Sequence, residues 1–152
     1  MASTEVAGTP MADRAVEVRG VWRSFGSAEA LRGVDFAAAS GEVTGMVGPN
    51  GAGKTTLLLI LSTLLAPDRG VVRIGGHDPM TETLAVRRML GWVPDAFGFY
   101  DNLTAHEYLA FAGSARGMRT PAAKARAVEL LGVVHLDAQA GQPVHLLSRG
   151  QK

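Results

Sequence analysis

The sequence contains no cysteine among its 152 residues. Because disulfides and thiolate-ligated zinc both need cysteine, this absence excludes a disulfide framework and a cysteine zinc site. The histidines show no metal-ligand spacing with one another, so we interpret them as surface or core residues. They are His77, His106, His135 and His145. A chain without cysteine fits a reducing compartment, and we expect a cytoplasmic location.

Long apolar runs and an excess of one charge are also missing. The most apolar segment, residues 57–65, is interrupted by Ser62 and Thr63, and it is far shorter than the roughly 20 residues of a membrane-spanning helix. The small, polar start of the sequence resembles neither a secretion signal nor a membrane anchor, and we expect residues 1–14 to be a disordered tail. The 15 basic and 14 acidic residues give a net charge of +1. These charges are spread along the chain and predict no nucleic-acid partner.

The sequence from residue 15 to residue 94 alternates between short apolar runs and breaks that contain glycine or proline. The run EVTGMV at 42–47 passes into a glycine-rich loop and then into TTLLLILSTLL, which predicts a strand, a loop and a helix in that order. The other predicted elements are strands at 16–21, 34–38, 71–74 and 89–93 and a short helix at 81–88. Alternation of this kind predicts a parallel sheet beside an N-terminal strand layer.

The pattern becomes helical after Pro94. Thr104 and Glu107 form the sequence signature of a capping box, which predicts a helix that continues to Gly113. Thr120 and the proline that follows it mark the start of a second helix, which we expect to end at Gly132. Residues 95–152 are therefore predicted to be mainly helical.

The clearest motif is GPNGAGKTT at residues 48–56, which matches the pattern GxxxxGK[ST]. Its glycines allow backbone N–H groups to converge on an anion, and a helix that begins at the same place favours negative charge. Lys54 is expected to contact the β- and γ-phosphates of a nucleotide, and the Thr55 hydroxyl to bind Mg²⁺. The residues predicted to hold the phosphates are Gly48, Asn50, Gly51, Gly53, Lys54, Thr55 and Thr56.

The alternative is a glycine-rich turn with a chance lysine. With typical composition the pattern arises about once in a few hundred chains of this size. The predicted strand before the loop and the predicted helix after it match the context that phosphate binding requires. We therefore interpret the motif as a nucleotide site, and its residues read phosphates rather than a base.

The segment VWRSFGSAEALRGVDFAAASGEVTGMVGPNGAGKTTLLLILSTLLAPDRGVVRIGG resembles the opening of an ABC transporter ATP-binding domain, and the resemblance continues to Lys152. It implies an α/β P-loop NTPase fold with an N-terminal antiparallel strand layer, a parallel core sheet and a helical subdomain. On this basis we expect residues 15–94 to form the strand layer and loop core, and residues 95–152 the helical part. The resemblance also implies that Phe25 stacks on adenine; the alternative is that Phe25 is a core residue beside a turn.

The segment LSRGQK at 147–152 is similar to the family's LSGGQ signature, with Arg149 at the third position. The resemblance implies that Ser148, Gly150 and Gln151 contact ATP held on the loop of a second ATP-binding domain, in a head-to-tail dimer. The alternative is a turn that caps a helix. Asp95 stands where most of the family carries glutamine. A carboxylate can hold Mg²⁺ or orient a water, whereas the alternative places Asp95 in a simple turn.

In the family the signature is followed by an apolar strand ending in Asp-Glu and by a switch histidine, and neither occurs in these 152 residues. The resemblance therefore implies that no catalytic residue is present and that the chain is a fragment. The implied function is that of an ATP-binding subunit that powers transport, in particular export, from the inner face of the cell membrane through separate permease subunits. The alternatives are a nucleotide-binding regulatory module that does not hydrolyse ATP, and a soluble family member acting on ribosomes or DNA.

Overall fold

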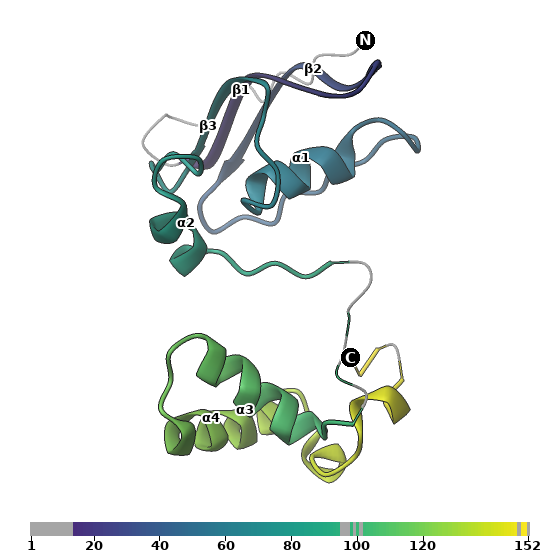
Figure 1. The fold of residues 1–152 in the computed structure, drawn as a ribbon, viewed down its shortest axis with the longest axis vertical. Helices are drawn as coiled ribbons and strands as arrows, with labels where there is room; N and C mark the ends of the chain where they lie inside the picture. The colour runs from purple at the N-terminus through teal and green to yellow at the C-terminus, as the bar shows by residue number, and fades with distance from the viewer. Residues whose placement is uncertain (1–13, 95–97, 99, 101, 149, 152) are drawn as a thin grey trace. The chain divides into compact units, whose positions relative to one another are not determined.

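The computed structural model describes residues 14–94, 98, 100, 102–148, 150 and 151. The chain divides into two compact units, one up to Val93 and the other from Pro94 onward, and each is described by itself (Figure 1). The expected tail at residues 1–14 lies outside the described residues, except for Arg14.

The first unit is built on a three-stranded antiparallel sheet with the order β2-β1-β3 (Figure 1). The strands are β1 (Arg14–Phe25), β2 (Ala28–Ala39) and β3 (Arg69–Ile74). β1 and β2 form a hairpin in which Phe25 pairs with Ala28 beside the turn. The strands predicted at 16–21, 34–38 and 71–74 are confirmed. Each real strand is longer than the apolar run that predicts it, because ladder hydrogen bonds also hold the flanking polar residues.

Two helices pack their apolar side chains against this sheet. They are α1 (Lys54–Leu61) and α2 (Thr83–Met89), and both predicted helices are therefore confirmed. The shared core contains residues from all three strands and both helices: Val18, Val21, Leu31, Leu57, Ile60, Val72, Ile74 and Val86. Burying one such side chain stabilises the fold by about 1.5–3 kcal/mol. Leu57 and Ile60 therefore anchor α1, and with it the loop that precedes α1.

Two predicted strands are wrong for the described residues. Residues 42–49 form no regular element, and 89–93 contribute only the last residue of α2 followed by irregular chain. A strand exists only where a neighbouring strand pairs with its backbone, and in the part of the chain that the structure describes no parallel partner lies beside either segment. The side chains of Val43 and Val47 are accordingly fully exposed. The apolar patterns are those of buried strands, but the described residues form only the antiparallel sheet.

The second unit is helical. Its elements are α3 (Ala105–Ala115), α4 (Thr120–Val133) and the 3₁₀ turns η2 (Asp137–Gln139) and η3 (Val144–Leu146). A core of Ala105, Leu131 and Leu147 holds them together. The predicted end of the first helix at Gly113 is wrong, because α3 runs to Ala115. Gly113 instead brings α3 close to α4, since a β-carbon there would lie 3.2 Å from Cβ of Ala123.

The predicted capping box at the start of α3 is confirmed. The Glu107 backbone N–H donates to the Thr104 hydroxyl at 3.2 Å, and the Thr104 backbone N–H donates to Glu107 Oε2 at 2.9 Å. The hydrogen bond from the Thr104 backbone N–H holds the pKa of the Glu107 carboxyl below its usual value. A hydrogen bond from the Thr104 hydroxyl lowers this pKa further, by a smaller amount. In the part of the chain that the structure describes, no helix is long and apolar enough to cross a membrane.

Replacing Thr104 with alanine removes the acceptor for the Glu107 amide, so we expect α3 to be destabilised by about 0.5–2 kcal/mol. Amide hydrogen exchange along α3 measures this loss as faster opening. Thr120→Ala is the matched control, because α4 begins at that residue without a side-chain cap hydrogen bond. Equal effects of the two substitutions on their own helices would contradict a stabilising cap at Thr104.

Candidate nucleotide-binding site

The glycine-rich loop lies in the first unit and leads directly into α1, which begins at Lys54. Gly51 and Gly53 have positive φ angles of 80° and 85°, a conformation that favours glycine. The Ala52 N–H donates to the Pro49 carbonyl at 3.2 Å and closes a turn within the loop. Residues 48–52 are all exposed, so a ligand can reach the loop from solvent. The arrangement of loop and helix start suits an anion.

Gly53 fixes the loop against the sheet. A β-carbon on Gly53 would lie 2.5 Å from the Ala30 carbonyl oxygen and 2.6 Å from Cδ2 of Leu31, so no larger residue fits there. Leu31 pairs with Arg23 across the β1–β2 hairpin, and Phe25 pairs with Ala28 at the end of the same hairpin. The end of the loop therefore rests on the hairpin that carries Phe25.

Lys54 folds back over the loop that precedes it. Its Nζ donates to the Gly48 carbonyl at 2.6 Å and to the Pro49 carbonyl at 2.7 Å. The ammonium group is therefore held above the loop by two acceptors that phosphate oxygens can replace. Thr55 is exposed in the first turn of α1, next to the same loop, while Thr56 is half-buried.

Phe25 lies outside the hydrophobic core, and 50% of its side chain is exposed. This finding disagrees with the alternative in which Phe25 is a core residue. The guanidinium carbon of Arg23 lies 4.9 Å from the centre of the Phe25 ring, within the range of a cation–π contact. The exposed ring is therefore held on one side by a neighbour on its own strand.

Arg23 and Asp68 are contacts of this site that the sequence analysis does not predict. Arg23 Nη1 donates to Asp68 Oδ1 at 2.7 Å, and the Ser24 backbone N–H donates to Asp68 Oδ2 at 2.7 Å. One signal was available: Arg23 and Phe25 are two residues apart on a strand, so their side chains share a face. The contribution of Asp68 has no local signal, because Asp68 lies directly before β3, 45 residues further along the chain than Arg23.

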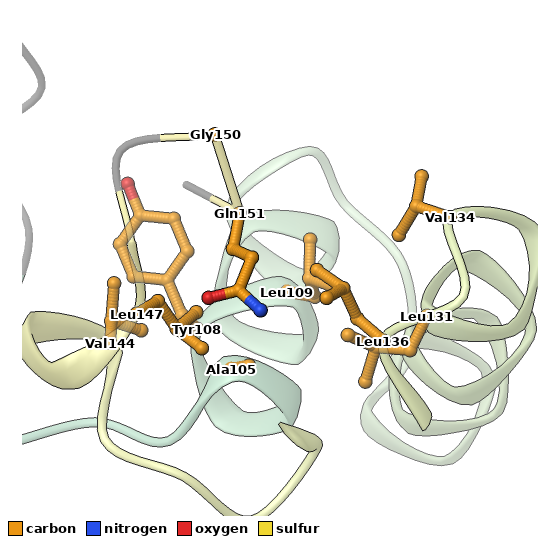
Figure 2. A pocket seen from close by; sticks show the side chains of 10 residues that line it. All are labelled: Ala105, Tyr108, Leu109, Leu131, Val134, Leu136, Val144, Leu147, Gly150 and Gln151. Atoms are coloured by element: carbon orange, nitrogen blue, oxygen red, sulfur yellow. The ribbon is translucent and has the colours of Figure 1, made fainter. Parts of the chain in front are cut away.

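The candidate signature residues lie in the second unit. The Gln151 backbone N–H donates to the Ser148 carbonyl at 3.0 Å, and the Ser148 N–H donates to Gln151 Oε1 at 2.9 Å, so the two residues close a turn. Leu147 is buried and anchors this turn in the core. Figure 2 shows Gly150 and Gln151 beside a largely apolar cavity of about 440 Å³. Ser148, Gly150 and Gln151 themselves are exposed.

The structure therefore brings the predicted residues together in two groups. The loop and Phe25 share the first unit, and Ser148, Gly150 and Gln151 share the second. Asp95 and Arg149 lie outside the described residues. Among the described residues, no three histidine or acidic side chains gather in a way that could hold a metal ion.

Comparison with known proteins gives consistent results. The family model described as "ABC transporter" matches residues 31–152. Over 121 residues the chain is 42% identical to the daunorubicin resistance ATP-binding protein DrrA3 of Streptomyces coeruleorubidus, a match that covers 80% of this chain and 38% of that protein. Over 137 residues it is 34% identical to the linearmycin resistance ATP-binding protein LnrL of Bacillus subtilis, covering 90% of this chain and 44% of that protein.

A solved structure described as the ATP binding subunit of an ABC transporter superposes with a TM-score of 0.75 at 27% identity, covering 90% of this chain and 57% of that one. The chain thus spans less than half the length of the two curated relatives. Along the chain, strands β1 and β2 are followed by the glycine-rich loop, then by β3 and then by the helical unit, in the order that the resemblance implies. The family match covers most of the chain, and the chain belongs to the ABC transporter ATP-binding family.

Proposed function

We propose that the chain binds ATP with Mg²⁺ on the loop at residues 48–56, as part of an ATP-binding subunit that powers transport. The observation that carries the proposal is the loop itself. Two left-handed glycines, an exposed backbone and the start of α1 meet beside the Lys54 ammonium group. In this proposal the phosphates are surrounded by the backbone of the loop, at Gly48, Asn50, Gly51, Gly53 and Thr56. A polyphosphate supplies the charge that this arrangement favours.

Lys54 changes partners when the nucleotide binds. In the structure its ammonium group donates to two neutral acceptors, the carbonyl oxygens of Gly48 and Pro49, at 2.6 and 2.7 Å. Phosphate oxygens carry charge, and hydrogen bonds between charged partners are roughly twice as strong as those between neutral ones. Lys54 therefore exchanges two neutral acceptors for charged ones, and this exchange favours binding.

The magnesium ion needs few protein ligands in this proposal. Mg²⁺ is usually held by one or two protein groups together with phosphate oxygens and water. The exposed hydroxyl of Thr55, in the first turn of α1, fits the role of that protein group. We assign Asp95 as a second ligand from the sequence alone. When bound, the ion neutralises phosphate charge, and the chain's own part is to place one hydroxyl beside the loop.

Phe25 provides a stacking surface for the base. Half of its side chain is exposed, and its hairpin touches the loop at Gly53. An aromatic face holds any base without reading its edge. The proposed site therefore combines phosphate recognition by the loop with base stacking on Phe25.

The whole protein is proposed to act as a dimer of ATP-binding domains joined to separate permease subunits. The turn formed by Ser148, Gly150 and Gln151 closes over ATP held by the partner domain in this arrangement. The names of DrrA3 and LnrL associate those relatives with resistance to daunorubicin and linearmycin. They support export as the direction. In this proposal the chain lies on the cytoplasmic side of the membrane, and hydrolysis of ATP by the whole protein supplies the energy.

Lys54→Ala removes the charged donors, so we expect affinity for Mg-ATP to fall about 10- to 150-fold, which corresponds to about 1.5–3 kcal/mol. Isothermal titration calorimetry measures the change. Lys124→Ala is the matched control, because Lys124 is an exposed lysine on α4. Binding of Mg-ATP that is equally tight in the wild type and in Lys54→Ala would rule out the loop as the phosphate site.

Phe25→Ala removes the stacking surface, and we expect a loss of about 1–3 kcal/mol in nucleotide binding, or about 5- to 150-fold. Because stacking reads no base edge, ATP and GTP should lose affinity by the same factor. Tripolyphosphate, which has no base, should bind the wild type and the variant equally. Phe25→Tyr keeps a ring and should retain most of the affinity. An unchanged affinity for ATP, or an equal loss of affinity for ATP and tripolyphosphate, would contradict the assigned role.

We also propose that the 152-residue polypeptide binds ATP without hydrolysing it. The residues assigned here hold phosphates, magnesium and the base, whereas hydrolysis also needs a group that orients the attacking water. Phosphate release by the polypeptide is expected to equal that of the Lys54→Ala control in the same assay. Turnover that depends on Lys54 would contradict this part of the proposal.

A further inference from the structure

One face of the Phe25 ring is already in contact with Arg23. The two side chains are two residues apart on β1 and therefore lie on the same face of the strand. The guanidinium carbon lies 4.9 Å from the ring centre. A guanidinium over a ring face is attracted by the ring's quadrupole, and this attraction favours one ring orientation over others.

Asp68 holds the guanidinium in this position. Its Oδ1 accepts from Arg23 Nη1 and its Oδ2 from the Ser24 backbone N–H, both at 2.7 Å. The Asp68 backbone N–H donates to the Trp22 carbonyl at 2.9 Å. Asp68 is therefore hydrogen-bonded to Trp22, Arg23 and Ser24, the three residues of β1 that directly precede Phe25.

The Arg23 side chain is only 24% exposed, so its pairing with Asp68 is partly shielded from water. Its Nε is buried and has no hydrogen-bond partner in the part of the chain that the structure describes. The guanidinium is thus held by a carboxylate on one edge and by the ring beneath it, rather than by a full set of hydrogen bonds. Its position depends on Asp68 and Phe25 together.

Phe25 belongs to the β1–β2 hairpin, against which the end of the glycine-rich loop packs. Gly53 contacts β2 at Ala30 and Leu31, and Leu31 is the cross-strand partner of Arg23. The β1–β2 pair therefore fixes both the orientation of the Phe25 ring and the position of the loop.

We propose that Arg23 and Asp68 form a positioning pair for the base of a bound nucleotide. Arg23 covers one face of Phe25 and leaves the other face for the base, and Asp68 fixes Arg23. The pair acts only through Phe25 and does not touch the phosphates. This inference rests on the proposed nucleotide site and assigns two further residues to it. Binding is favoured because a ring already held in place loses little freedom when a base stacks on it.

The test compares Mg-ATP with magnesium tripolyphosphate in the purified protein by calorimetry. Arg23→Ala and Asp68→Asn should each weaken ATP binding by about two- to fivefold, the scale of an exposed cation–π contact. Affinity for tripolyphosphate should stay unchanged in both variants. Arg23→Lys keeps the charge without the planar group and should recover part of the lost affinity. Arg32→Ala is the matched control, since Arg32 forms an exposed ion pair with Glu29 on β2.

A double-mutant cycle separates positioning from general stability. In a Phe25→Ala background, Arg23→Ala should cause no further loss of ATP affinity, because its effect passes through the ring. Equal weakening of both ligands, no weakening of either, or an undiminished effect without Phe25 would overturn the inference. If neither Lys54→Ala nor Phe25→Ala changed the affinity for Mg-ATP, the proposed function itself would be overturned, and the inference with it.

Discussion

The contact between Gly53 and the backbone of β2 is the constraint on which the proposed nucleotide site depends. A β-carbon on Gly53 would lie 2.5 Å from the Ala30 carbonyl oxygen, and the φ angle of Gly53 is +85°. Both observations require glycine at this position. α1 begins at the next position, and its Leu57 and Ile60 are buried against all three strands. The loop is thus held at its end by a steric contact and beyond it by core packing. The position of the proposed phosphate cradle follows from the packing of α1 against the β1–β2 hairpin.

Local chemistry explains the features that the sequence predicts correctly. The glycine pattern specifies a loop before a helix, and the Thr104 and Glu107 pair specifies a helix start, because in both cases the interacting groups lie within a few residues. The role of Asp68 is not predictable in this way. Its partners Arg23 and Ser24 lie more than 40 residues earlier in the chain, and only the folded sheet brings the three residues together.

The two wrong strand predictions have a different cause. The run at 42–47 has the composition of a buried strand, but composition records what a segment can bury and not whether a partner lies beside it. In the described residues Val43 and Val47 face solvent instead. Gly113 shows the converse error. Glycine usually signals a helix end, yet here its small size serves the packing of α3 on Ala123 of α4.

The folded-back position of Lys54 has a thermodynamic consequence. Its ammonium group is already bonded to the Gly48 and Pro49 carbonyls, so an arriving ligand gains only the difference between those bonds and its own. A ligand with a single negative charge offers a small difference, whereas a chain of phosphates offers a large one. In the proposed site Lys54 thereby makes the loop discriminate between anions by charge density as well as by shape. In the proposed site the two carbonyls compete with any arriving anion for the ammonium group, so a singly charged anion such as chloride or bicarbonate displaces them less readily than a polyphosphate does.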